Sequence, residues 1–222
     1  MPSISREENR RARMEFIKAF FDDFDNKVDY LEELYKSEHR DEARILCSCY
    51  IDSLASALYW PDERSNFNYV KSLREYSGNE IFSHIHPKML DEAVRKLSKR
   101  STNWATIHTK VSPKLQGADR KLYAEQEVID LLATSLETSE MENTRRELWR
   151  GTFAAIVYDQ FRIASVHGFG PPEGITFDGT TFQGQPVPTI DFSMVHDCLK
   201  KIVAAAREFS EKTGKWFGHD YD

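Results

Sequence analysis

Hydrophobic residues recur every three or four positions along most of this chain, which is the spacing of a buried face on an α-helix. The clearest example runs from about residue 6 to 37 and includes Phe16, Phe20, Phe24, Val28 and Leu31. Similar runs predict further helices over about 38–60, 66–76, 87–99, 119–138, 142–167 and 191–213. Residues 100–118 are less regular, and we expect a connection that contains serine, threonine and tryptophan.

Turn residues separate these runs. Trp60-Pro61 ends the second run, because proline disfavours helix at the residue before it. Asp178-Gly179, set among Thr, Phe and Ile, is typical of a small β-hairpin. The predicted fold is an all-α antiparallel helical bundle with a small hairpin before the C-terminal helix. We expect one domain spanning 1–222, with a basic insertion around 79–118.

Composition narrows the class of protein. The chain has 222 residues, a net charge of −6 and 40% hydrophobic residues, which is too many for a wholly disordered chain. No long apolar stretch that could span a membrane and no secretory signal is evident, and three cysteines are too few for a disulfide scaffold. We therefore expect a cytoplasmic protein without a membrane partner.

The charge is unevenly distributed. Residues 71–120 contain 10 basic and 5 acidic side chains, although the chain as a whole is acidic. The basic island consists of Lys88, Arg95, Lys96, Lys99, Arg100, Lys110 and Lys114. Such an island attracts phosphate groups, but it is equally typical of a solvated helix face.

The strongest candidate chemistry lies at the end of the sixth predicted helix, where Arg162 and His167 precede a Gly168–Pro172 stop. The guanidinium of Arg162 is a permanent phosphate donor, and His167 at a helix C-terminus is suited to acid–base catalysis. Together they suffice to assist attack of an RNA 2′-hydroxyl on the adjacent phosphodiester without a metal. In ideal α geometry the two side chains lie roughly 140° apart, so the last turn must unwind or tighten. Alternatively, Arg162 pairs with Asp159 and His167 only caps the helix.

Other residues carry weaker hypotheses. Cys47 and Cys49 point to opposite sides of a helix and are interpreted as buried structural thiols. His84, His86 and His108 could be imagined as metal ligands, but no Cys or carboxylate spacing supports a site. Asp52 is either a paired core residue or a partner of His167. We expect no metal and no cofactor.

Arg162-x4-His167 near the end of a long helix resembles the Arg-x4-6-His signature of the HEPN superfamily. The resemblance extends to the segment 35–55, which is similar to the paired early helices of bacterial HEPN-like proteins, and to Val166-His-Gly-Phe-Gly-Pro-Pro172. It implies a helical bundle that dimerises so that two Arg/His pairs meet, and a metal-independent ribonuclease in a toxin–antitoxin or phage-defence system.

The resemblance also implies roles for individual residues. Arg162 and His167 would be catalytic. Lys96, Lys99, Arg100 and Tyr158 would contact RNA. A second copy of the chain and an antitoxin-like protein are the implied protein partners. Family members commonly place a polar residue directly after the arginine, whereas this chain has Ile163. The alternative is therefore a non-catalytic interaction or nucleotide-binding module.

Overall fold

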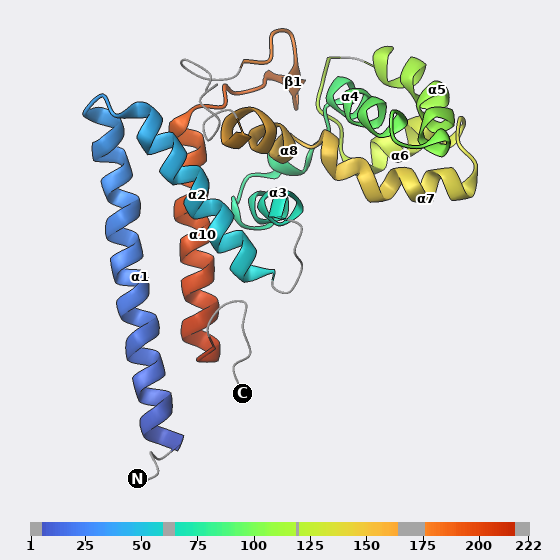
Figure 1. Ribbon diagram of the computed structural model, residues 1–222. Coiled ribbons are helices and arrows are strands. Elements are labelled where there is room, and N and C mark those ends of the chain that lie inside the picture. Colours follow the sequence, from blue (N-terminus) through green and yellow to red (C-terminus); the bar gives the residue numbers. More distant parts are fainter. Residues whose placement is uncertain (1–5, 60–64, 119, 164–175, 216–222) are drawn as a thin grey trace. The chain divides into compact units, whose positions relative to one another are not determined.

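The computed structural model describes residues 6–59, 65–118, 120–163 and 176–215 (Figure 1). It is a helical protein with one two-stranded hairpin before the C-terminal helix, which confirms the predicted fold class. Within these residues no helix combines the length and the apolar character that a membrane crossing requires.

The chain forms two compact units. Unit 1 takes both ends of the chain, up to Gly78 and from Asp191 onward, together with Arg162 and Ile163. Unit 2 takes Asn79–Phe161 and the hairpin segment up to Ile190. Unit 2 begins where the basic insertion was expected to begin, but it extends well beyond residue 118. A single domain spanning 1–222 stays a prediction.

The described residues of unit 1 form a bundle of four α-helices. They are α1 (Arg6–Lys36), α2 (Arg40–Leu58), α3 (Ser65–Tyr76) and α10 (Phe192–Thr213). Helices α1 and α10 lie side by side, and α2 packs against both (Figure 1). All four agree with the predicted runs to within about two residues. Helix α10 begins where its sequence indicates, since the side chain of Asp191 accepts a hydrogen bond from the backbone N–H of Met194.

The core of unit 1 follows the periodicity of its helices. Helix α1 buries residues spaced by three or four, and α2, α3 and α10 supply the facing side chains. The buried set includes Ile17, Phe21, Phe24, Val28, Leu31, Cys47, Ile51, Leu54, Tyr69, Leu73, Val195, Leu199 and Ile202. Burial of this surface holds the four helices together.

Unit 2 is built from shorter elements. In chain order they are η1 (Glu80–Ser83), α4 (Pro87–Ser98), α5 (Thr102–Gln116), α6 (Glu125–Ala133), α7 (Thr138–Glu147), η2 (Leu148–Gly151), α8 (Phe153–Val157) and the π-helix η3 (Tyr158–Ile163), followed by strands β1 (Thr181–Phe182) and β2 (Gln185–Pro186). The last two residues of η3 belong to unit 1.

Three sequence predictions for unit 2 are wrong in detail. Residues 102–116 are helix α5 and not a connection, although Pro113 lies inside it. The helix expected over 119–138 is only α6, because residues before it pair as isolated β-bridges. The run expected over 142–167 breaks at Gly151 and Thr152. Asp119, where the helix over 119–138 was predicted to begin, lies outside the described residues.

The hairpin exists, but its turn lies five residues beyond the predicted one. Strands β1 and β2 are antiparallel and pair Phe182 with Gln185, so the turn consists of Gln183 and Gly184. Both have positive φ angles, 50° and 78°, as a tight hairpin turn requires. Asp178-Gly179 forms an earlier turn, in which Gly179 has a φ of 70°.

Ile85 joins three segments of unit 2. Its backbone pairs with Tyr123 and with Thr152, and the N–H of the next residue, His86, donates to the carbonyl of Gly151 at 2.8 Å. Gly151 has to be glycine here, because a Cβ atom at this position would lie 2.6 Å from Cβ of Leu90. These contacts fix the start of α4.

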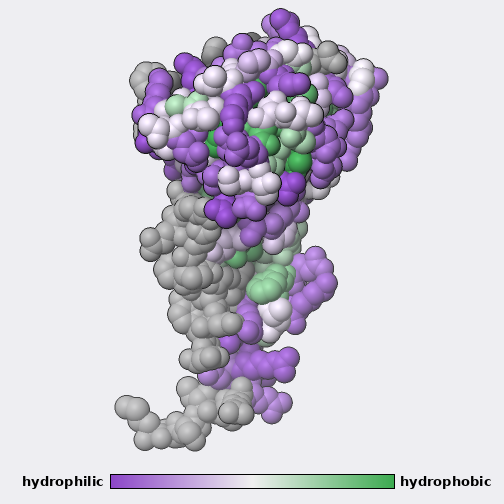
Figure 2. All heavy atoms as spheres, turned by 90° about the vertical axis from the view of Figure 1, so that its right-hand side faces the viewer, coloured by the Kyte–Doolittle hydropathy of each residue, from purple (hydrophilic) through white to green (hydrophobic). Residues whose placement is uncertain are grey.

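One face of unit 2 is mostly polar (Figure 2). Figure 2 shows this side as mostly hydrophilic, with a small group of hydrophobic residues near its middle. Behind it lies a buried cluster that includes Leu90, Val94, Ile107, Val111, Val128, Leu132 and Leu148. Part of the basic island is therefore a solvated face over an apolar core.

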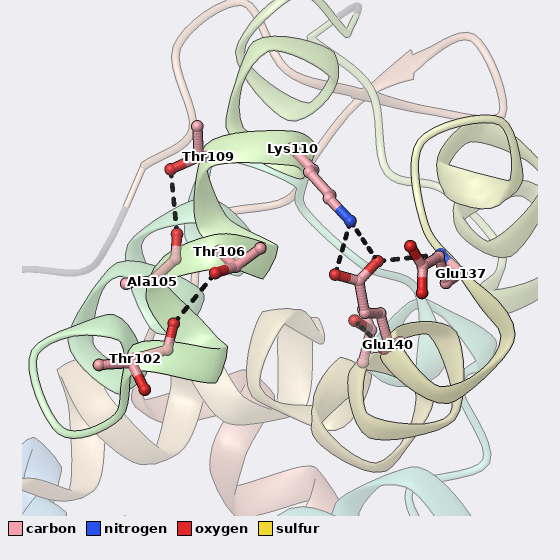
Figure 3. Close-up of polar contacts among 8 residues, drawn as sticks. Thr102, Ala105, Thr106, Thr109, Lys110, Glu137 and Glu140 are labelled. Atoms are coloured by element: carbon pink, nitrogen blue, oxygen red, sulfur yellow. Dashed lines mark hydrogen bonds and ion pairs between the residues drawn. The ribbon is translucent and has the colours of Figure 1, made fainter.

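An ion pair inside unit 2 links α5 to α7. Nζ of Lys110 lies 2.6 and 2.7 Å from the two carboxylate oxygens of Glu140, which also accepts the backbone N–H of Glu137 (Figure 3). Glu140 is buried. Its hydrogen bond with Lys110, and secondly that with Glu137, lower the pKa of Glu140 below the ordinary 4.5.

Replacing Lys110 with methionine is expected to lower the free energy of unfolding by about 2 kcal/mol at pH 7, because Glu140 loses its charged partner. A carboxyl whose pKa is lowered by folding stabilises the protein above its unfolded pKa, and this contribution is lost as the pH falls through the folded pKa. The difference between wild type and Lys110→Met should therefore shrink below pH 4.5. Urea unfolding at several pH values measures it. Lys114→Met, an exposed position on α5, is the control, and equal losses in both variants would contradict the prediction.

Candidate functional site

Arg162 lies in the π-helix η3, which continues directly from α8. Phe161, its neighbour, is buried and anchors this segment. A π-helix bonds residue i to i+5, so it turns side chains differently from the α-helix that the sequence predicts. The helix is thus altered at Arg162 itself, whereas the turn that leads to His167 lies outside the described residues.

The guanidinium of Arg162 is held by a carboxylate from α2. Nη2 of Arg162 donates to Oδ2 of Asp52 at 2.8 Å, and each side chain is only 19% exposed. The two residues are 110 positions apart in the chain. The pairing of Arg162 with Asp159 that the sequence allowed is thus replaced by an ion pair across the bundle. Asp52 is thus paired, as the first of its two interpretations expects, and the second, a contact with His167, falls on a residue outside the described ones.

Asp52 is the last of three polar residues on one face of α2. Arg44, Ser48 and Asp52 are spaced by four, and both Arg44 and Ser48 are buried. At the far end of this stripe the guanidinium of Arg44 lies 5.9 Å from the ring centroid of Tyr35. These three residues place polar and charged side chains inside unit 1 along one face of α2.

Tyr69 from α3 adds a neutral donor beside this stripe. Its side chain is fully buried, and burial raises the pKa of Tyr69 well above its usual value; the charge of Asp52 acts in the same direction. The phenol is therefore protonated at any physiological pH. Asp52 is thus charge-coupled to Tyr69 and ion-paired with Arg162.

This arrangement can present a cation at a defined position. A guanidinium held by one carboxylate keeps its planar set of donors, and restricting its rotation lowers the entropy cost of binding a phosphate. The same carboxylate also compensates its charge. His167, the second predicted catalytic residue, lies outside the described residues.

The predicted RNA-contacting residues belong to unit 2. Lys96 is exposed on α4, Lys99 is its C-cap, and Arg100 is exposed just beyond. Tyr158 is partly buried at the start of η3. Lys96 lies close enough to Asp159 for their charges to interact. These lysines and arginines form a solvated surface, as one of the two interpretations of the basic island expects.

The three histidines of the metal hypothesis make separate contacts. The ring of His84 packs against Phe182, with centroids 4.6 Å apart, whereas Nε2 of His86 lies 3.4 Å from Oγ1 of Thr180. His108 faces Asp91. Across the part of the chain that the structure describes, no three His, Cys, Asp or Glu side chains are grouped to hold a metal ion.

The two cysteines of α2 differ. Cys47 is buried, and burial raises its pKa far above the usual value for a thiol. Cys49 is exposed, so the expectation of two buried thiols is right for Cys47 and wrong for Cys49. The third cysteine, Cys198, is also buried, which raises its pKa to about 12. The two buried thiols are structural.

Sequence reasoning missed a pocket that lies wholly within unit 2. Its volume is about 860 Å³, and its walls come from the start of α4, the inner side of α5, Arg120 and the segment before the hairpin. Lys88 and Arg95, seven residues apart on α4, were a partial signal, because that spacing puts both on one helix face. The contribution of residues 176–180 had no signal in the sequence.

Comparison with models of protein families, with curated proteins and with solved structures finds no match to this chain.

Proposed function

We propose that the chain is a HEPN-like, metal-independent endoribonuclease that acts in a toxin or phage-defence context. The observation that carries the proposal is the position of Arg162, which is largely buried and held by Asp52 at 2.8 Å, five residues before His167. A guanidinium can stabilise the charge and an imidazole can transfer the proton in phosphodiester cleavage. A second copy of the chain would supply a second Arg/His pair.

In the proposed reaction the RNA 2′-hydroxyl attacks the adjacent phosphorus. The bond from the 2′-oxygen to phosphorus forms while the bond from phosphorus to the 5′-oxygen breaks, which leaves a 2′,3′-cyclic phosphate and a 5′-hydroxyl. His167 transfers the proton from the 2′-hydroxyl to the departing 5′-oxygen. Arg162 stabilises the negative charge that accumulates on the phosphoryl oxygens. Lys96, Lys99, Arg100 and Tyr158 would hold the strand.

Cleavage of purified total RNA in the presence of EDTA tests the proposal. Wild type is expected to produce fragments with 2′,3′-cyclic phosphate ends. Arg162→Ala and His167→Ala should each slow cleavage by roughly 100-fold or more, since each removes a group that acts on the transition state. Arg207→Ala is the matched control, because Arg207 is also paired with aspartates in unit 1, at 2.9 and 3.1 Å. Equal cleavage by all four proteins would remove Arg162 and His167 from the mechanism.

A second candidate is a non-catalytic interaction module that binds a protein partner such as an antitoxin. Two observations favour it: the carboxylate of Asp52 compensates the charge of Arg162, and the apolar Ile163 follows the arginine. Wild type that leaves RNA intact yet forms a stable complex with a partner encoded nearby would support this function over the first.

A further inference from the structure

The described lining of the pocket in unit 2 does not include Arg162, Tyr158 or the three predicted RNA-contacting residues of the basic island. Its volume of about 860 Å³ falls in the range of small-molecule sites, which is about 300–1,000 Å³. Charged, amide and aromatic side chains all line it. Such a mixture is typical of a site that binds a ligand with a charged end and a flat end.

Three basic side chains face this pocket. Lys88 and Arg95 lie on α4, and Arg120 approaches from the opposite wall, where Nη1 lies against Gly179. All three are exposed, and no ion pair links any of them to another residue in the described ranges. By contrast, Arg44, Lys110 and Arg162 all have carboxylate partners. Among the described residues, the pocket therefore gathers three cations that make no ion pair.

The first turn of α4 adds further positive character. Pro87, Lys88 and Met89 line the pocket, and the side chain at the N-cap, His86, makes no capping hydrogen bond. The backbone N–H groups of a helix N-terminus carry a partial positive charge and bind anions, phosphate above all. The basic side chains and the N-terminus of α4 therefore both favour an anion in this pocket.

Acidic side chains also line the pocket and limit its positive charge. Oδ2 of Asp91 accepts a hydrogen bond from Nε2 of Gln116 at 3.0 Å, and Oδ1 lies 3.2 Å from Nε2 of His108. Glu92 and Asp178 also belong to the lining. Three carboxylates disfavour a polyanion, so a ligand with a single phosphate fits better than one with several.

An aromatic wall lies beside the basic groups. Phe177 lines the pocket and packs on Phe153, with centroids 5.2 Å apart, and on His86 at 6.2 Å. Burial, and secondly the charge of Lys88, lower the pKa of His86, so its ring is neutral near pH 7. A flat apolar group of a ligand could stack against this wall.

We propose that this pocket binds a small molecule that carries one phosphate group and a planar ring. Lys88, Arg95, Arg120 and the start of α4 hold the phosphate, and Phe177 contacts the ring. The site is independent of Arg162 and His167, so it stands whether or not the chain cleaves RNA.

Isothermal titration of the full-length protein tests the proposal with three probes: AMP, ribose 5-phosphate and adenosine. AMP and ribose 5-phosphate are expected to bind saturably, whereas adenosine, which lacks the phosphate, should not. Arg95→Gln and Arg120→Gln should each raise the Kd for AMP at least about tenfold, or about 1.4 kcal/mol. Lys114→Gln, an exposed lysine outside the pocket, is the matched control and should change the Kd less than about twofold, as expected for a screened surface charge. Phe177→Ala should weaken the binding of AMP more than the binding of ribose 5-phosphate.

Two further arms separate this site from its alternatives. Arg162→Ala should bind AMP like wild type, which distinguishes failure of the pocket from failure of the ribonuclease proposal. A 5′-phosphorylated RNA oligonucleotide that binds more tightly than AMP would assign the phosphate to a strand end and overturn the small-molecule proposal. Absence of saturable binding at millimolar AMP and ribose 5-phosphate, or an equal loss in Lys114→Gln, would overturn it too.

Discussion

Replacing Phe153 with alanine is expected to lower the free energy of unfolding by about 3–5 kcal/mol, the usual range for removing a buried phenylalanine. Phe153 is fully buried at the start of α8 and contacts Phe82, with ring centroids 5.6 Å apart, and Phe177 at 5.2 Å. Its backbone N–H donates to the carbonyl of His84 at 2.8 Å, so the backbone cannot shift far to fill the space. The cavity should therefore stay open.

Hydrogen exchange of amides in 79–161, followed by mass spectrometry, measures this loss within unit 2. Phe16→Ala is the control, because Phe16 is 63% exposed on α1 and its removal should change stability by less than about 0.5 kcal/mol. Phe153→Ala should also weaken AMP binding, since Phe177 loses the ring that supports it. A loss of stability below about 1 kcal/mol would show that the aromatic cluster is not the core of this unit.

Asp52→Ala and Arg162→Ala are each expected to cost about 2 kcal/mol of stability, because each leaves a largely buried charge without its partner across the bundle. The double variant should cost about as much as either single one. The sum of the two single losses minus the loss in the double variant is the coupling energy. It is expected to be about 1–2 kcal/mol and measures the ion pair itself. Urea unfolding of the four proteins gives this cycle.

The matched cycle uses Arg207 and Asp22, which also lie 2.9 Å apart in unit 1 but are more exposed. Its coupling should be below about 1 kcal/mol. Additive losses for Asp52 and Arg162 would mean that the pair contributes no net interaction. If Asp52 also positions Arg162 for catalysis, Asp52→Asn should reduce RNA cleavage while leaving the fold intact, which a purely structural pair would not do.

The helices of unit 1 could be predicted because each has one continuous apolar face. Helix α10 also has its capping aspartate, Asp191, and a glycine at its end, Gly214, with a φ of 66°. Such local signals predict the folded structure, because the tertiary contacts favour the same backbone conformation as the local sequence. The same holds for α4, which begins with Pro87 at its first position.

Unit 2 was harder to predict because long-range pairings decide it. Ile85 takes its backbone partners from Tyr123 and Thr152, far along the chain, and these bridges end or delay the neighbouring helices. Helix α5 was missed because Pro113 and several threonines argue against a helix, yet Ile107, Val111 and Leu115 bury one face. Tertiary burial outweighs propensity there.

The candidate site, too, could be predicted only in part. The spacing of Arg162 and His167 was visible in the sequence, but the partner of Arg162 comes from 110 residues away, and nothing local identifies it. The pocket of unit 2 had only a partial signal in the sequence, since its basic groups and its aromatic wall come from separate stretches of chain.

The order of the helices in unit 1 has a consequence for synthesis on the ribosome. Helix α1 is made first and α10 last, yet they pack together and share one core. Until α10 emerges, Phe21 of α1 lacks its contact with Arg207, while most of unit 2 is already complete as one continuous stretch. Domains made from continuous chain fold as they are translated. We therefore expect nascent chains that end before residue 192 to depend on chaperones, although most of unit 2 has already been made.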